Sequence, residues 1–302
     1  MKSKKIIIGV RGSKLALIYA ERAKKEVLKF YSQVEIKKIT TLGDVNQKDR
    51  LSEIGGKGLF SKKIEDELID KKIDIAVHAL KDMPAIETKG LITNCFLERN
   101  DPREVLISHN KNFLNKLKPD SVIGTSSFRR EYQLKRIRSD LKYKLIRGNV
   151  DTRLKKLDEN LYDAIILSYA GIKSLELDKK ITQIFSTKEI IPSVGQGVVA
   201  LQCRNNDFEI IELLKKVNHN QTNICVSAER KLLKILEGDC ETAVGAIANL
   251  EGEKIILEAE LFSLDGKKRF YHKSSKNINF SLELGKEVGE ILKKESNNSY
   301  KR

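Results

Sequence analysis

Lys81 and Asp82 stand side by side, separated by three residues from a short, mostly apolar run, residues 73–77, which has the character of a buried strand. In α/β proteins, ligands bind in the crevice outside the carboxyl ends of the strands, so a charged pair at this point faces that crevice. An aspartate there could move protons or stabilise a developing positive charge. The alternatives are a loop salt bridge or an aspartate that caps a helix. Asp82 is therefore a candidate catalytic residue.

A second group of candidates consists of arginines at or near the ends of predicted strands in two successive α/β segments. Its members are Arg11, Arg103, Arg129, Arg130, Arg147 and Arg153. Arg129 and Arg130 fall in the first turn of a predicted helix, where cations oppose the helix dipole and a bound anion would offset the cost. A guanidinium binds a carboxylate or phosphate with two hydrogen bonds. The pattern indicates an anion site, and the alternative is a set of independent surface arginines.

Hydroxyl side chains accompany the arginines at two of these turns. Ser13 follows Arg11 in a strand–loop–helix segment, where we expect it to be the helix N-cap, and Thr125 and Ser127 stand just before the next such helix. Backbone N–H groups at a helix start, together with the helix dipole, form a pocket that favours anions. A strand, a turn that carries a hydroxyl side chain, and a helix start with an arginine nearby therefore occur twice along the chain.

The four cysteines, Cys95, Cys203, Cys225 and Cys240, are scattered, without a CxxC pair or a disulfide framework. The four histidines also lack metal-ligand spacing, so we expect no metal site. In a reducing compartment each cysteine is by default a small buried apolar residue. Cys240 differs because it lies on a glycine-containing loop between a predicted helix and strand. It could be a thiolate nucleophile if basic neighbours lower its pKa, or a structural cysteine.

The chain of 302 residues carries a formal charge of +15, which favours an anionic partner. Nucleic acid is disfavoured because there is no helix-turn-helix, zinc-finger or RNP motif, no tryptophan, and only 6% aromatic residues for base stacking. No run approaches the roughly 18 apolar residues that span a bilayer, and no signal-peptide core follows the basic start. We therefore expect a cytoplasmic protein that binds neither membranes nor nucleic acid.

The candidate residues require a scaffold of alternating strands and helices. Short apolar runs predict strands at 6–10, 34–41, 73–77, 91–97, 105–108, 122–124, 143–146 and 163–167, with helical spacing between many of them. The break at 192–197 precedes a strand at 198–202 that we expect to return to the first domain, as in two-lobed binding folds. Beyond a polar linker at 217–223, a helix at 224–236, three strands and a helix at 282–293 precede a disordered polar tail.

This pattern predicts an α/β protein of three domains, since the chain is too long for one ordinary core. The first α/β domain comprises residues 1–99 plus 197–216, and the second comprises 100–196. A small α+β domain comprises 217–302. Residues 43–60 are polar, aperiodic and rich in glycine, which fits either a flexible lid over a crevice or a plain surface loop.

Seven motifs together resemble the porphobilinogen deaminase family, also called hydroxymethylbilane synthases. They are RGSKLAL at 11–17, GGKGLF at 55–60, HALKDMP at 78–84, GTSSFRR at 124–130, RGNVDTR at 147–153, PSVGQG at 192–197 and LEGDC at 236–240. Each motif is weak by itself. All seven occur in the family's order and spacing across nearly the whole chain, which makes the resemblance specific.

The resemblance implies two domains like those of a periplasmic binding protein and a third that carries a cofactor. That cofactor is dipyrromethane, built from two porphobilinogen units and joined through a thioether, here to Cys240. The family's enzymes add four more porphobilinogens, lose ammonia each time and release hydroxymethylbilane by hydrolysis. The resemblance also implies a monomer, with porphobilinogen as the small-molecule substrate and no metal.

The resemblance further implies roles for individual residues. Asp82 would be the catalytic carboxylate. Residues that bind the cofactor, besides Cys240, would be Lys81, Thr125, Ser127, Arg129, Arg130, Arg147 and Arg153. Substrate would contact Arg11, Ser13 and Gln196, and Lys57 and Phe60 would lie on the lid. Each pyrrole brings two carboxylates, so a six-ring intermediate carries about twelve, which suits a crevice rich in arginine.

The chain departs from the family pattern at several positions. Ser174 replaces a usual arginine, so one carboxylate contact is lost or passes to Lys173, and Tyr19 replaces a usual glutamine. Asp239 and Glu241 flank Cys240, and their negative charges should raise the pKa of the thiol and slow cofactor attachment.

Two other classes of protein remain as alternatives. A non-catalytic two-lobed binding protein for a carboxylate ligand would explain the arginines, but it would leave the third domain and Cys240 without a role. A nucleic-acid-binding protein would show binding that weakens steeply with salt, because counterions are released.

Overall fold

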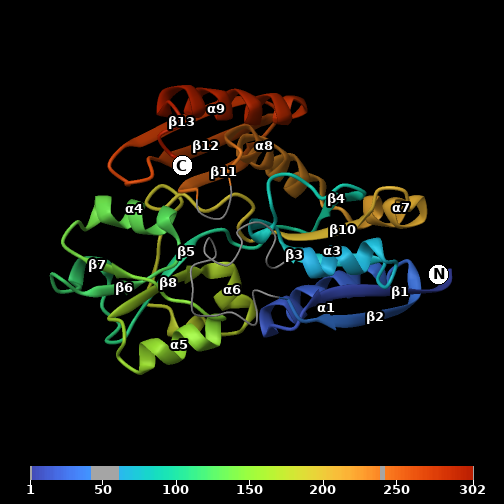
Figure 1. Ribbon diagram of the computed structural model, residues 1–302, viewed down its shortest axis with the longest axis horizontal. Coiled ribbons are helices and arrows are strands. Elements are labelled where there is room, and N and C mark those ends of the chain that lie inside the picture. The colour runs from blue at the N-terminus through green and yellow to red at the C-terminus, as the bar shows by residue number, and fades with distance from the viewer. Residues whose placement is uncertain (1, 42–60, 239–241, 302) are drawn as a thin grey trace. The chain divides into compact units, whose positions relative to one another are not determined.

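The computed structural model describes residues 2–41, 61–238 and 242–301 (Figure 1). Lys57 and Phe60 of the predicted lid, and Cys240 with its neighbours Asp239 and Glu241, lie outside the described residues. Internal contacts divide the chain into two units. The first comprises Met1–Asn100 and Val198–Val226, and the second comprises Asp101–Gly197 and Ser227–Arg302. This division into two units does not test the predicted boundaries of the three domains, which stay a prediction.

The first unit is built on a five-stranded sheet with the order β2-β1-β3-β10-β4. The strands are β1 (Lys2–Arg11), β2 (Tyr31–Ile39), β3 (Ile75–Ala79), β4 (Leu91–Phe96) and β10 (Val199–Arg204). β1 is parallel to both β2 and β3, whereas β10 is antiparallel to β3 and β4. Because β1 and β3 are parallel neighbours, Arg11 and the turn after Ala79 emerge at the same edge of the sheet.

Helices cover both faces of this sheet. α1 (Lys14–Val27) and α7 (Phe208–Val217) share one core cluster with Ile6, Ile8 and Val10, which alternate along β1 as one face of a strand requires. α3 (Lys62–Ile69) buries Ile64 and Leu68 in a separate cluster with the neighbouring strands. α1 begins at Ser13, whose hydroxyl accepts the Ala16 N–H at 3.4 Å, as its N-cap role predicted.

The second unit contains a five-stranded sheet of order β7-β6-β8-β5-β9. Its strands are β5 (Glu104–Ser108), β6 (Val122–Gly124), β7 (Lys142–Lys144), β8 (Ala164–Ser168) and β9 (Gln183–Ile184). β6 is parallel to β7 and β8, and β5 is antiparallel to β8, with Glu104 opposite Ser168. The ends of β6, β7 and β8 and the start of β5 therefore share one edge. The helices are α4 (Phe128–Ile137), α5 (Val150–Asp158) and α6 (Tyr169–Ser174).

A three-stranded antiparallel sheet completes the second unit. It consists of β11 (Val244–Glu251), β12 (Lys254–Phe262) and β13 (Arg269–Asn277) in that order. α9 (Ser281–Ser296) packs on β12 and β13 (Figure 1). The predicted class, two α/β sheets plus a small α+β part, is confirmed.

Two predictions near the C-terminal part were wrong. The segment predicted as a polar linker at 217–223 is largely helical, because α8 (Asn220–Leu236) begins within it. The predicted disordered tail is ordered through residue 301: the Tyr300 side chain is buried, and its hydroxyl donates to the Leu236 carbonyl at 3.0 Å. One buried aromatic ring is enough to anchor a short polar end.

Candidate active site

In the first unit, Asp82 lines an open cavity of about 60 Å³ at the carboxyl edge of β1 and β3. The polar residues around it are Arg11, Ser13, Tyr19, Ser61, His78 and Asp82. Three of the predicted site residues, Asp82, Arg11 and Ser13, are thus brought to one cavity by elements far apart in sequence. Tyr19, noted as a departure from the family pattern, forms part of its wall.

A single 3₁₀ turn, Leu80–Asp82, positions the Lys81–Asp82 pair. The Leu80 N–H donates to the Val198 carbonyl at 3.0 Å, and Leu80 and Met83 are buried in one cluster with residues of β10 and β4. These two apolar anchors leave the charged residues between them half-buried. The two buried apolar residues on either side of the charged pair therefore hold the backbone at Asp82, and its carboxylate is not needed for that.

A buried chain of polar side chains extends from His78, one of the residues that line this cavity. His78 Nε2 is 3.2 Å from Gln202 Oε1, the Gln202 amide donates to Glu65 Oε1 at 3.0 Å, and the Thr88 hydroxyl donates to Glu65 Oε2 at 2.9 Å. His78, Gln202 and Glu65 are all buried. Burial lowers the pKa of His78, against the raising effects of Glu65, the Gln202 hydrogen bond and Asp82.

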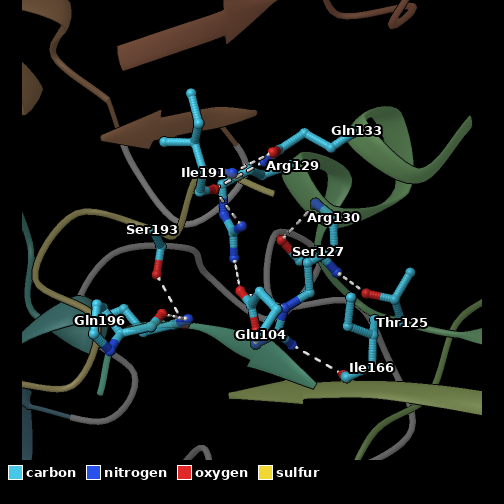
Figure 2. Close-up of polar contacts among 11 residues, drawn as sticks. Glu104, Thr125, Ser127, Arg129, Arg130, Gln133, Ile166, Ile191, Ser193 and Gln196 are labelled. Carbon is cyan, nitrogen blue, oxygen red and sulfur yellow. Dashed lines mark hydrogen bonds and ion pairs between the residues drawn. The ribbon is translucent and has the colours of Figure 1, made fainter. Parts of the chain in front are cut away.

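The second unit holds Arg129 and Arg130 against a buried carboxylate, Glu104 (Figure 2). Arg129 Nη2 lies 2.6 Å from Oε1 of Glu104, while Arg130 donates through Nε at 3.0 Å and Nη2 at 2.8 Å. Nη1 of Arg129 donates to the Ile191 carbonyl, and Nη1 of Arg130 donates to the Ile166 carbonyl. Burial lowers the pKa of Arg129, although Glu104 opposes that shift. Two cations share one anion, so the group retains a net positive charge.

Arg147 has no such compensation. Its side chain is 8% exposed, its Nε is buried without a hydrogen-bond partner, and no carboxylate pairs with it among the residues that the structure describes. Burial lowers its pKa. Arg147 follows β7, and the Ser126 hydroxyl donates to the neighbouring Ile146 carbonyl, which joins this loop to the one after β6. The arrangement presents an unpaired guanidinium at the edge where Arg129 and Arg130 also lie.

The remaining predicted residues of this edge make local contacts. Ser127 caps α4 by accepting the Arg130 N–H at 3.4 Å, and Thr125 Oγ1 accepts the Ser127 N–H at 3.1 Å. Arg153 donates from Nε to the Gly148 carbonyl at 2.8 Å. These bonds fix the loops after β6 and β7, so hydroxyls and cations stay at one edge.

Gln196 is fully buried, and its amide donates to the Pro102 carbonyl at 2.7 Å. The neighbouring Gly195 N–H donates to Glu229, a buried carboxylate of α8 that also accepts the Ala248 N–H. The side-chain amide of Gln196 thus already holds the segment 192–197 to the start of the second unit. A contact between Gln196 and substrate stays a prediction.

Sequence reasoning missed Glu104 and the chain from His78 to Glu65. A signal existed for each: Glu104 opens an apolar strand two residues after a proline, and His78 interrupts the apolar run of β3. A charged or titratable residue inside a buried strand requires a partner. The sequence does not say which partner it has.

The α/β sheets, the cavity at Asp82 and the arginine-rich edge have the features of an α/β protein with sites for an acidic small molecule. Comparison with known proteins narrows this class. Residues 6–212 match the family model described as porphobilinogen deaminase, dipyromethane cofactor binding domain, and residues 223–294 match the porphobilinogen deaminase C-terminal domain.

Individual relatives agree with the family models. Porphobilinogen deaminase of Macrococcus caseolyticus is 39% identical over 292 residues, which cover 96% of this chain and 94% of that protein. The same-named protein of a Wolbachia strain from Drosophila simulans is 42% identical over 288 residues, covering 95% and 97%. A solved structure, the probable amino-acid ABC transporter extracellular-binding protein ytmK of Bacillus subtilis, covers 72% of this chain and 90% of its own at 15% identity and a TM-score of 0.45.

The chain belongs to the porphobilinogen deaminase (hydroxymethylbilane synthase) family, as the seven motifs predicted. It contains the family's dipyrromethane cofactor-binding domain. Porphobilinogen is the substrate of this family, whose role lies in tetrapyrrole biosynthesis. No helix among the described residues is both long and apolar enough to cross a bilayer.

Proposed function

We propose that the protein deaminates four porphobilinogen molecules and condenses them head to tail onto a dipyrromethane primer, then releases hydroxymethylbilane. The primer would be attached through a thioether to Cys240, which lies in the LEGDC motif. The observation that carries the proposal is the buried, unpaired guanidinium of Arg147. An uncompensated buried cation is costly, and a carboxylate ligand would remove that cost.

The residues present fit a polycarboxylate cofactor. Arg129, Arg130 and Glu104 together carry one excess positive charge, and Arg147 adds a second at the same edge of the sheet. Acetate and propionate arms would bind there through charge-assisted hydrogen bonds. We propose Thr125, Ser127, Arg153 and Lys81 as further contacts of the cofactor. When bound, the dipyrromethane supplies the nucleophilic pyrrole carbon to which the first substrate is joined.

Asp82 supplies the negative charge that the reaction needs. Loss of ammonia from porphobilinogen leaves a cation on the substrate, and coupling places positive charge on the attacked ring. A carboxylate fixed by the Leu80–Asp82 turn stabilises both charges without reorganising, and it can accept the proton that the coupled ring loses. Arg11 and Ser13 share its cavity and would hold the carboxylate arms of the incoming substrate.

The remaining assignments follow from the family motifs. Gln196 would contact substrate at the 192–197 segment, and Lys57 and Phe60 would belong to a lid. We propose that the three-domain division also applies, with residues 217–302 carrying the cofactor and a monomer as the working form.

Intact-mass spectrometry tests the attachment. We expect the purified protein to exceed its sequence mass by one dipyrromethane, and Cys240→Ser to remove the excess together with activity on porphobilinogen. Cys225→Ser is the matched control because Cys225 is a buried cysteine on α8 that is not part of the LEGDC motif. It should keep the added mass. A wild-type protein that is unmodified yet active with porphobilinogen would exclude this role for Cys240.

A further inference from the structure

The cavity lined by Asp82 is also lined by a histidine, His78, that the proposed mechanism does not use. His78 lies on β3, four residues before Asp82, and both residues line the same cavity. Its ring makes one hydrogen bond among the described residues, from Nε2 to Gln202 at 3.2 Å. The other ring nitrogen, Nδ1, has no partner in that part of the chain. A buried histidine with one engaged nitrogen and one unused nitrogen beside a catalytic carboxylate requires an explanation.

The chain of hydrogen bonds below His78 has a fixed direction. The carboxylate of Glu65 accepts from Thr88 at one oxygen and from the Gln202 amide at the other. Because a carboxylate only accepts, the NH₂ group of Gln202 must face Glu65, and its carbonyl oxygen must face His78. That oxygen cannot donate, so His78 must carry its proton on Nε2. The network selects one tautomer of the ring.

The ring also stays neutral. Burial favours the uncharged imidazole and is the largest influence on the pKa of His78, which is lowered. The charged groups that face it are Glu65 on α3, Asp82 on the following turn and Arg11 at the end of β1; the two carboxylates raise the pKa and Arg11 lowers it. A neutral ring with its proton on Nε2 has a lone pair on Nδ1. His78, a residue that lines the cavity, is therefore able to accept a hydrogen bond at Nδ1.

We propose that His78 Nδ1 and the Asp82 carboxylate together bind the aminomethyl ammonium of porphobilinogen, the group that leaves as ammonia. This inference rests on the proposed function, since it names the part of the substrate that enters the cavity. A primary ammonium has three N–H donors and no acceptor, which suits a cavity whose lining residues include two acceptors, His78 and Asp82. The volume of about 60 Å³ suits a small polar arm, with the ring and its acid arms outside.

The chemical step is balanced without a proton on His78. When the carbon–nitrogen bond breaks, both electrons go to nitrogen, so the –NH₃⁺ group leaves as neutral ammonia and the positive charge moves to the pyrrole-derived cation. His78 holds the nitrogen before and during this step, and Asp82 remains negative to face the cation. A histidine fixed as an acceptor keeps the arm oriented for departure.

A pair of substitutions separates this role from a purely structural one. His78→Asn keeps an oxygen near the position of Nδ1 and loses the donor to Gln202, whereas His78→Gln keeps a donor near Nε2 and loses the Nδ1 acceptor. We expect His78→Gln to raise the KM for porphobilinogen about tenfold, the loss typical of a hydrogen bond to a charged group. His78→Asn should stay within about threefold of wild type. The exposed His109→Gln is the control and should not change KM.

A substrate analogue with methyl in place of aminomethyl provides the second arm of the test. Its inhibition constant should be the same for wild type and His78→Gln, since it lacks the group that His78 binds. Equal losses for porphobilinogen and the analogue would overturn the proposal, as would a His78→Gln enzyme that matches wild type while His78→Asn fails. If wild type itself does not consume porphobilinogen, the proposed function fails, which is a different result.

A measurement on the unaltered histidine covers the case in which both variants unfold. The protein has four histidines, so nitrogen-15 histidine labelling gives a spectrum simple enough to assign. In Cys240→Ser protein, which cannot be primed, we expect His78 to show an unprotonated Nδ1 whose resonance shifts with porphobilinogen and not with the methyl analogue. A proton on Nδ1, or no shift with porphobilinogen, would refute the assignment.

Discussion

The buried group of Arg129, Arg130 and Glu104 gives a prediction about stability. Glu104→Gln preserves the shape of the side chain but removes the single negative charge that the two guanidiniums share. It also turns an NH₂ group toward groups that can only donate. Two cations, 4% and 8% exposed, are then left without a carboxylate.

The expected cost follows from the contacts. Three charge-assisted hydrogen bonds, from 2.6 to 3.0 Å, end on Glu104. The Ile191 and Ile166 carbonyls still accept from the arginines in the variant, so part of the solvation is retained. Removing one partner of a buried ion pair costs about 3–5 kcal/mol, and we expect the free energy of unfolding to fall by that amount. For a unit of this size, the melting temperature falls by roughly 6–20 °C.

Urea unfolding followed by circular dichroism measures the change, with Glu131→Gln as the matched control. Glu131 pairs with Lys135 at 2.6 Å on the exposed face of α4, the helix that carries Arg129 and Arg130. The free energy of unfolding should fall there by no more than about 0.5 kcal/mol. The loss at Glu104 should be smaller in the cofactor-loaded protein than in the Cys240→Ser background, because bound carboxylates replace part of the missing charge. A loss below about 1 kcal/mol in the unloaded protein would refute the view that Glu104 neutralises these arginines.

Three other changes test separate features of the chain. Asp82→Asn should lower turnover about 10²–10⁴-fold while cofactor mass and melting temperature stay unchanged, and near-normal turnover would remove Asp82 from the mechanism. Arg147→Leu should slow porphobilinogen addition in a stopped-time assay without lowering the stability of the unloaded protein, because it removes an unpaired buried cation; a clear destabilisation in urea would reveal a partner instead. The pKa of Glu237 is lowered to about 2 by Lys301 and Lys293, so its contribution to stability should be full above pH 4.5 and be lost as pH falls toward 2. Glu237→Gln should flatten that part of a pH–melting curve, salt should weaken the effect, and an unchanged curve would contradict the pairing.

The strands and helices near the site were predictable because period-2 and period-3.6 patterns report burial directly. The strands near whose carboxyl ends Arg11, Asp82 and Arg147 lie were predicted from short apolar runs, and the cap at Ser13 was predicted from its place between a strand and a helix. The start of α8 was predicted four residues too late because its first turn is polar. Thr222 is the buried residue there, and a single buried residue gives no periodic signal.

The partners of charged residues were not predictable. The position of Arg129 and Arg130 in a first helical turn indicated that an anion must compensate them, and that reasoning was sound. Part of that anion, however, is Glu104 of the chain itself, brought from a strand 25 residues away in sequence. Pairings of this kind depend on which strand edge meets which helix, and a single sequence carries no pattern for that.

The ordered C-terminus has a practical consequence. Tyr300 bonds to the last residue of α8, and Lys301 reaches Glu237 at 2.9 Å, three positions before the cysteine that would carry the primer. Tyr300 and Lys301 therefore hold the C-terminal end of α8 and the residue that follows it. If the primer is attached at Cys240, deletion of Tyr300 and Lys301 should disturb its loading.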